Sequence, residues 1–320
     1  MKINGWLNID KPVGVTSNQV IGYVKRVLRS SFSQSPNPKA LIPKIGFAGT
    51  LDPMASGVLP IAIGEATKAI PYMIDAKKTY EFTIKFGIET DSGDVDGKII
   101  ATTNNLPSLE DVKNILPEFT GKIRQTPPIF SAIKIDGKRA YDLARKGIDF
   151  EMKEREVNIW ELGIEGAVEK NNQPSTINHQ QLKIITLKCT CSKGTYIRSL
   201  GRDIAKKLGS LGHLTYLRRL EVGCFSAEKA FKLEIEKGVQ NINLQNQFEY
   251  IISQTKPVDS VLDDIPVLNL RLEEVKNLRD GKIINSNYSN GIFRVYFEGV
   301  FQCLVNSDEG KLKVVRFFNL

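Results

Sequence analysis

The twelve residues GFAGTLDPMASG, from Gly46 to Gly57, contain one ionisable side chain, the carboxylate of Asp52. An Asp-Pro pair is typical of a turn in which the carboxylate bonds nearby backbone amides. The glycines, however, let the backbone approach another group closely, and the small side chains leave space above the loop. A carboxylate in such a hollow is also poised to act as a nucleophile or a base. Both a turn and an active site therefore remain open.

The patterns around this stretch predict an α+β fold with a mixed, mostly antiparallel sheet. The apolar run from Val58 to Ile63 is typical of a strand. The segment from Tyr80 to Phe86 alternates so strictly that every second residue shares one face of a strand. Helical spacing predicts helices from Ser17, as the capping residue, to Leu28 and from Thr195 to Leu208.

Weaker signals complete the prediction for the first part of the chain. Ser30–Pro43 is rich in Ser and Pro and indicates an exposed loop. Asp91–Gly97 has acidic spacing like that of a calcium loop but lacks the later bidentate Glu, so we interpret it as a turn. Further strands are predicted at Trp6–Ile9, Ile129–Ile135, Lys183–Cys191 and Leu214–Leu220, the last with its basic residues outward.

The composition changes near residue 256 and predicts two domains, 1–255 and 256–320. The second would be a compact, mainly β module of about sixty residues, near the lower limit for independent stability. Its predicted elements are a strand and a helix within 267–278 and strands at 293–297, 301–305 and 314–317.

The formal charge of the chain is +8, and it is unevenly distributed. From Lys183 to Lys232 there are eleven Lys or Arg residues against three Asp or Glu, a surplus as large as that of the whole chain. A local basic surface indicates a polyanionic partner, nucleic acid first. A solvated helix face is the alternative interpretation.

Four cysteines and two histidines give little basis for a metal site, because zinc sites usually use paired Cys-x-x-Cys or Cys/His sets. Cys189 and Cys191 would face one side of a strand, which favours buried, reduced thiols. No apolar run approaches the length of a membrane span, and Asp10 and Lys11 interrupt any signal-peptide pattern. We therefore expect no metal, no membrane contact and a cytoplasmic location.

Several motifs occur in order along residues 1 to about 255. GTLDPMASGVLP is followed by IGEATK, and the other motifs are KPVGVTS within 11–17, KTYEF within 78–82, QTPPIFSAIK with GKRAY within 125–141, CSKGTYIRSL within 191–200 and YLRRL within 216–220. Together they resemble the pseudouridine synthases of the TruB type, which modify uridine 55 of tRNA. The last sixty residues resemble, more loosely, an RNA-binding module of the PUA type.

The resemblance implies an answer for Asp52, which would be the catalytic carboxylate at the target uridine. By the same resemblance Arg198 would pair with Asp52 and favour its ionised form. Without the motif, Arg198 is an ordinary surface arginine of a helix. Tyr80 would pack against the target base and take part in proton transfer, although its alternation with apolar residues also suits a core aromatic.

Further substrate contacts are implied for Tyr196, Lys11, Leu217 and Lys134, although Lys11 and Leu217 could equally serve the fold. Many family members have His where this chain has Phe47. Phe47 could stack on a base, but it can neither donate a hydrogen bond nor titrate.

The resemblance implies isomerisation of uridine to pseudouridine in the TΨC loop of tRNA, by a monomer and without a cofactor. The enzyme would have to turn the nucleotide out of its stack, and residues 125–147 could cover the stem-loop. The main alternative is an RNA chaperone of the same fold, which would bind tRNA without catalysing a reaction. A nucleoside hydrolase is a second, and it would call for further carboxylates or a metal near Asp52.

Overall fold

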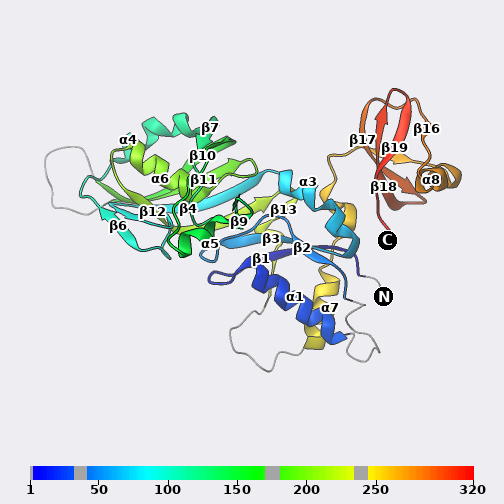
Figure 1. Cartoon of the computed structure of the whole chain (residues 1–320), viewed down its shortest axis with the longest axis horizontal. Coiled ribbons are helices and arrows are strands. Elements are labelled where there is room, and N and C mark those ends of the chain that lie inside the picture. Colours follow the sequence, from blue (N-terminus) through cyan, green and yellow to red (C-terminus); the bar gives the residue numbers. More distant parts are fainter. Residues whose placement is uncertain (1–2, 32–41, 170–180, 234–243) are drawn as a thin grey trace.

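A computed structural model describes residues 3–31, 42–169, 181–233 and 244–320. In these residues one large mixed sheet forms the body of the molecule, and a smaller sheet lies at one end (Figure 1). The large sheet runs in the order β14-β1-β3-β12-β4-β11-β10-β7, with β2 beside β3 and β13 beside β12. Its strands are β1 (Gly5–Lys11), β2 (Ile45–Phe47), β3 (Ser56–Ile63), β4 (Lys78–Phe86), β7 (Gly121–Gln125), β10 (Arg155–Glu169), β11 (Leu182–Cys191), β12 (Gly212–Val222), β13 (Phe225–Ser226) and β14 (Phe231–Lys232).

The α+β class and the mostly antiparallel sheet are confirmed. Only the short pairings of β1 with β14 and of β3 with β12 are parallel in the described large sheet. Two small hairpins lie outside it, β5 (Ile88–Thr90) with β6 (Ile99–Thr102) and β8 (Lys134–Ile135) with β9 (Lys138–Arg139). The helices of this part are α1 (Ser17–Ser31), α3 (Ile70–Asp75), α4 (Leu109–Ile115), α5 (Ala140–Arg145), α6 (Ile197–Lys207) and α7 (Leu244–Ser253), with 3-10 turns η1 (Gly64–Ala69), η2 (Leu116–Phe119), η3 (Ala227–Lys229) and η4 (Val258–Val261).

One face of the large sheet carries the main core. The alternation of β4 buries Phe82, Ile84 and Phe86 on this face, as predicted. Helix α6 lies across β4 and β12, while α1 and α7 lie side by side near β1 (Figure 1). The sheet thus holds β4, β12 and the start of α6 close together.

The C-terminal β module is also confirmed. Its sheet runs in the order β15-β17-β18-β19-β16 and has a small core of its own. Its elements are β15 (Val267–Asn269), α8 (Leu272–Arg279), β16 (Ile284–Asn285), β17 (Gly291–Phe297), β18 (Val300–Asp308) and β19 (Lys311–Phe317).

A second core joins this module to the large sheet. Phe301 and Phe318 pack in one cluster with Trp6 and Val58. The Trp6 indole N–H donates to the carbonyl of Val258 at 3.0 Å. The module is therefore attached by buried side chains as well as by the chain itself.

Two local expectations at the termini of elements are wrong. Ser17 does not cap α1, because its hydroxyl bonds Leu51 instead. Thr16 is the cap: its hydroxyl accepts from the Gln19 N–H at 3.1 Å while the Gln19 side chain accepts from the Thr16 N–H at 2.8 Å. The predicted loop from Ser30 begins later, since Ser30 and Ser31 belong to α1, and residues 32–41 lie outside the described residues.

The predicted strand at Ile129–Ile135 is also wrong, since only its last two residues pair, as β8. The prolines before it cannot donate to a ladder. The carbonyls of Thr126 and Phe130 instead accept hydrogen bonds from side chains of α6. Residues 126–133 therefore form an irregular segment bound to that helix. In the polar stretch before α7, residues 240–243 lie outside the described residues.

Strand β12 turns only Arg218 outward, with 25% of its side chain exposed, and it buries Arg219. Arg219 is 1% exposed, and Arg218 forms an ion pair of 2.9 Å with Asp10. The reason is alternation, since Arg219 follows the buried Leu217 on the same face of the strand. Within the described residues, no helix is both long and apolar enough to cross a bilayer.

Gly57 is expected to be indispensable for the junction of β3 and β12. It pairs with Arg219, has a φ of +102°, and a Cβ there would lie 2.1 Å from the Arg219 carbonyl oxygen. We expect Gly57→Ala to lower the free energy of unfolding, measured in urea, by more than about 4 kcal/mol. The matched control is Gly121→Ala, where φ is +89° and a Cβ meets no atom within 4 Å. It should lose only the 1–2 kcal/mol or so of backbone strain, and equal losses would refute the steric argument.

Candidate active site

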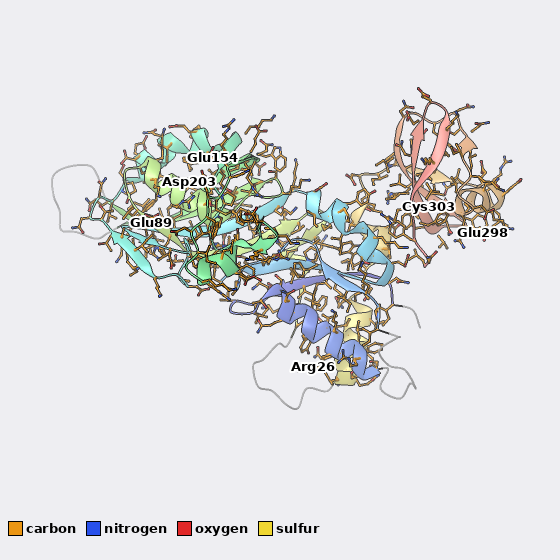
Figure 2. The ribbon with its side chains drawn as sticks, in the orientation of Figure 1. Arg26, Glu89, Glu154, Asp203, Glu298 and Cys303 are labelled. Carbon is orange, nitrogen blue, oxygen red and sulfur yellow. The ribbon has the colours of Figure 1, made fainter. Side chains whose placement is uncertain are left out.

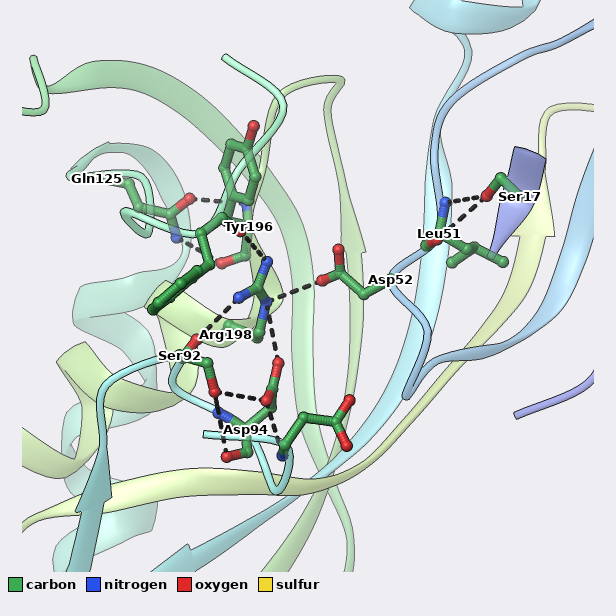
Figure 3. A network of polar contacts seen from close by, with 10 residues as sticks. Ser17, Leu51, Asp52, Ser92, Asp94, Gln125, Tyr196 and Arg198 are labelled. Carbon is green, nitrogen blue, oxygen red and sulfur yellow. Dashed lines mark hydrogen bonds and ion pairs between the residues drawn. The ribbon is translucent and has the colours of Figure 1, made fainter. Parts of the chain in front are cut away.

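The backbone of the loop that carries Asp52 is held by hydrogen bonds from three other parts of the chain. The Ser17 hydroxyl accepts from the Leu51 N–H at 3.0 Å and donates to the Leu51 carbonyl at 3.1 Å (Figure 3). Arg219 Nη2 donates to the Gly49 carbonyl at 3.1 Å, and the Gly14 N–H donates to the Pro53 carbonyl at 2.7 Å. The backbone makes a turn, with the Ala55 N–H on the Asp52 carbonyl, yet the carboxylate points away from the loop. The two interpretations of this stretch are therefore compatible: the loop forms a turn, and the turn presents the Asp52 carboxylate to the candidate site.

Arg198 meets that carboxylate from the first turn of α6. Its Nε lies 2.8 Å from the Asp52 carboxylate, which is 35% exposed, whereas the Arg198 side chain is only 5% exposed. Nη1 donates to the Ser92 carbonyl at 2.8 Å and Nη2 to the Phe130 carbonyl at 2.9 Å (Figure 3). Every nitrogen of the guanidinium therefore has a partner, and its position is fixed.

A second carboxylate, not foreseen from the sequence, also faces Arg198. Asp94 lies 3.6 Å from Arg198 Nε and its side chain is 6% exposed. It accepts from the Ser92 hydroxyl at 2.6 Å and from the Asp96 N–H at 3.0 Å. Because the predicted turn holds three aspartates, at 91, 94 and 96, the sequence alone could not tell which one turns inward.

A cavity of about 250 Å³ opens beside Asp52, bounded by its loop, the starts of β4 and α6, and the end of β12. Its lining includes four further predicted residues, Tyr80, Tyr196, Arg198 and Leu217. The lining residues that were not predicted include Lys78, Ser131 and Arg219. Sequence positions from 49 to 219 thus converge on one cavity.

Tyr80 and Arg219 face each other across the pairing of β4 with β12. Burial raises the pKa of Tyr80, and the neighbouring Arg219 guanidinium only partly offsets that effect. The Tyr80 hydroxyl therefore keeps its proton at neutral pH. Arg219 also donates from Nε to the Val58 carbonyl at 2.8 Å, so one side chain joins β12, β3 and the Asp52 loop.

Tyr196 immediately precedes α6 and is held through its backbone. The Gln125 side chain accepts from the Tyr196 N–H at 2.8 Å and donates to the Tyr196 carbonyl at 3.0 Å (Figure 3). Gln125 is 1% exposed. This reciprocal pair fixes the direction in which α6 begins, and with it the place of Arg198.

Three predicted residues are not among those that line the cavity. Lys11 is fully buried, and its Nζ donates to the carbonyls of Val15 at 2.7 Å and Pro12 at 2.9 Å, with Pro53 at 3.5 Å. It supports the Asp52 loop from the side of β1. Phe47, on β2, is half-buried and packs against the main core. Lys134 is exposed on β8.

The basic segment from Lys183 to Lys232 does not form an unpaired basic surface. Six of its eleven basic side chains form ion pairs. Lys206, for example, meets Glu89 at 3.2 Å, and Arg202 meets Asp203 at 3.1 Å. Glu89 and Asp203 both lie on the large-sheet part, away from the C-terminal module (Figure 2). In five of the six pairs the carboxylate comes from outside this segment, so distant parts of the chain offset much of the surplus.

The cysteines are free thiols, of which Cys189, Cys191 and Cys303 are buried, whereas Cys224 is exposed. In the described part of the chain, no three His, Cys, Asp or Glu side chains gather in a way that could hold a metal ion. The polar groups of the cavity are one carboxylate, amines, guanidiniums and hydroxyls, which suit proton transfer, nucleophilic attack and binding of a polar planar group.

Lys78 is expected to make stability depend on pH. Burial, with Arg219 and Lys193 nearby, lowers its pKa to about 8, against the opposing influence of Cys191 and Asp75. Between about pH 8 and 10 the unfolded chain still binds this proton and the folded chain does not, so stability rises with pH. From pH 7.5 to 9.5 we expect native protein to gain about 1–2 kcal/mol more than Lys78→Met. Urea unfolding at both pH values measures this, and equal gains would refute it.

Family models and curated relatives all indicate the same protein family for this chain. The family model of the TruB pseudouridylate synthase N-terminal domain matches residues 38–197. That of the tRNA pseudouridylate synthase B C-terminal domain matches residues 198–263. The tRNA pseudouridine synthase B of Novosphingobium aromaticivorans is 42% identical to this chain, over 99% of this chain and 98% of its own length. That of Rickettsia akari is 37% identical over 99% of each.

Solved structures with low sequence identity have the same fold. A chain of the H/ACA ribonucleoprotein bound to a substrate RNA containing 2′-deoxyuridine has a TM-score of 0.66 at 19% identity, covering 99% of this chain and 85% of that chain. A chain of a Cbf5-Nop10-Gar1 complex has a TM-score of 0.64 at 21% identity, covering 98% of this chain and 84% of that chain.

Proposed function

The chain belongs to the TruB family and is an enzyme that forms pseudouridine in tRNA, and from this premise we propose that it acts on uridine 55 in the TΨC loop with Asp52 as its catalytic carboxylate. The observation that carries this proposal is the pairing of a partly exposed carboxylate with a buried, fully bonded arginine at the edge of a cavity. An ion pair of this kind holds the carboxylate in one position beside the cavity.

The reaction breaks the bond between C1′ and N1 of the uridine and forms one between C1′ and C5. The hydrogen of C5 leaves as a proton, and N1 gains one. Asp52 would either add to C1′ or remove a proton from the ribose, and both routes need its ionised form. Tyr80, Tyr196 and Leu217 would contact the base, with the neutral Tyr80 hydroxyl as a hydrogen-bond donor.

A base inside a folded loop must be turned out before the cavity can receive it. The segment from Gln125 to Gly147 supplies exposed basic side chains for the phosphates of the stem-loop, including Lys134, Lys138 and Lys146. On one side of the cavity, the carbonyls of Thr126 and Phe130 accept hydrogen bonds from side chains of α6. These bonds fix the start of the segment that carries the basic side chains. Phosphate contacts are mostly independent of sequence.

We also propose that the enzyme acts as a monomer. With tRNA as its substrate, we expect the enzyme to act in the cytoplasm. None of the steps above uses a metal or an organic cofactor, because the reaction is an isomerisation.

The test is the release of tritium from tRNA that carries 5-tritiated uridine. We expect native protein to release the tritium of one uridine per tRNA and to release none when cytidine replaces uridine 55. Release that persists with the cytidine variant would contradict the assigned position. Tight tRNA binding with no release from either RNA would favour a chaperone without turnover.

A further inference from the structure

Two buried cations line the cavity without a carboxylate partner. Arg219 is 1% exposed and Lys78 is 5% exposed. Arg219 bonds the carbonyls of Val58 and Gly49, and Lys78 bonds those of Ile74 and Ala76, the latter at 2.6 Å. In the part of the chain that the structure describes, neither forms an ion pair.

The other cations at the cavity are already neutralised. Arg198 faces Asp52 and Asp94, and Lys193 at the rim lies 2.7 Å from Asp75. A buried charge that only carbonyl dipoles compensate is unfavourable. The positive potential of the cavity is therefore concentrated at Arg219 and Lys78, where it favours an anion.

The proposed reaction produces an anion at this place, and this inference rests on that proposed function. When C1′–N1 breaks, both electrons of the bond stay with uracil, whose negative charge spreads over N1 and the two carbonyl oxygens. The base is expected to lie against Tyr80, and Tyr80 pairs with Arg219 across the strands. Backbone phosphates would instead meet the rim, where Lys193 is 60% exposed.

We propose that Arg219, with Lys78 beside it, stabilises the uracil anion while the base is detached from the ribose. The anion then turns within the cavity, and its C5 supplies the electron pair for the new bond to C1′. The proton of C5 leaves afterwards, which restores a neutral base. Arg219 thus acts on the leaving group, whereas Asp52 acts on the sugar.

The test compares native protein and Arg219→Gln on two tRNAs, one with uridine and one with 5-fluorouridine at the target position. Fluorine withdraws electrons and stabilises the uracil anion, so a site that has lost this stabilisation should be helped more by it. We expect the variant to convert uridine at least about 100-fold more slowly in single turnover, the usual effect of removing one such donor. With 5-fluorouridine, C5 has no proton to lose after the new bond forms, so the product keeps its fluorine and takes up water across N1=C6. Measured as this C5-linked hydrate by mass spectrometry of nuclease digests, the deficit of the variant should be at least about tenfold smaller.

Equal deficits with both RNAs would overturn the proposal, because Arg219 would then serve only to hold the Asp52 loop. A weaker tRNA affinity with a shallower salt dependence and an unchanged ratio would assign Arg219 to a phosphate, which also overturns it. Lys78→Met does not touch the Gly49 and Val58 carbonyls, and it should change the ratio in the same direction, which keeps the test available if Arg219→Gln fails to fold. Failure of the proposed function would differ, as native protein would convert neither RNA.

Discussion

Replacing Asp52 by asparagine is expected to slow pseudouridine formation by at least about 10³-fold in single turnover, measured by tritium release. Asparagine has the same shape, and its carbonyl oxygen can still accept the hydrogen bond from Arg198 Nε, which lies 2.8 Å from the carboxylate. The loop is held by Ser17, Gly14 and Arg219 through its backbone, so its conformation should survive. The substitution therefore removes the charge of Asp52, and with it the nucleophile or base of the proposed reaction, and little else.

The matched control is Asp75→Asn, because Asp75 pairs with Lys193 of the cavity lining. That carboxylate is 60% exposed and pairs with an exposed lysine, so its loss should change the rate less than about twofold. Affinity for tRNA should be unchanged in both variants. Activity of Asp52→Asn within tenfold of native would remove Asp52 from the reaction.

Replacing Arg198 by methionine should reduce both stability and rate. It leaves the Asp94 carboxylate buried without a cation and frees the carbonyls of Ser92 and Phe130. Breaking a buried ion pair by removing one partner costs about 3–5 kcal/mol, which urea unfolding measures. Because Asp52 also loses its support, we expect a rate at least about 10³-fold lower.

Adding Asp94→Asn to this variant separates the two effects. The buried carboxylate is then neutral, so most of the lost stability should return, while the rate should stay low because Asp52 is still unsupported. Arg202→Met, one turn further along α6, is the control. Its side chain is 24% exposed and bonds Asp203 and the Thr126 carbonyl, so its loss should affect the rate only a few-fold. Recovery of the rate in the double variant would contradict the role given to Arg198.

The strands of the large sheet were largely predictable, because burial on one face leaves an alternating pattern. Tyr80–Phe86 shows this plainly, and β4 covers it. The irregular segment after Gln125 was not predictable from the sequence, because its backbone accepts hydrogen bonds from side chains of a helix about seventy residues further along the chain. Such partners have no local signature.

For the site, the sequence alone indicated Asp52 and left its role open, and the family resemblance supplied the partner Arg198. Asp94 and Arg219 were missed for different reasons. Asp94 sits in a polar turn that is normally solvated. Arg219 could have been found, because alternation from Leu217 places it on the buried face, but a charged residue on a strand is usually taken as exposed. The charge surplus from Lys183 to Lys232 indicated a nucleic-acid partner, which agrees with tRNA as the substrate of the family. It could not show that carboxylates elsewhere in the chain pair with several of these side chains.

The position of β3 between β1 and β12 has a consequence for synthesis of the protein on the ribosome. The Asp52 loop leads into β3, yet its supports at Arg198 and Arg219 are translated about 146 and 167 residues later. While the chain grows from the N-terminus, β3 has β1 beside it but lacks its other neighbour until β12 has been made. Nascent chains that end before Arg219 therefore carry Asp52, the proposed catalytic residue, without the rest of its site, and we expect activity to begin only late in translation.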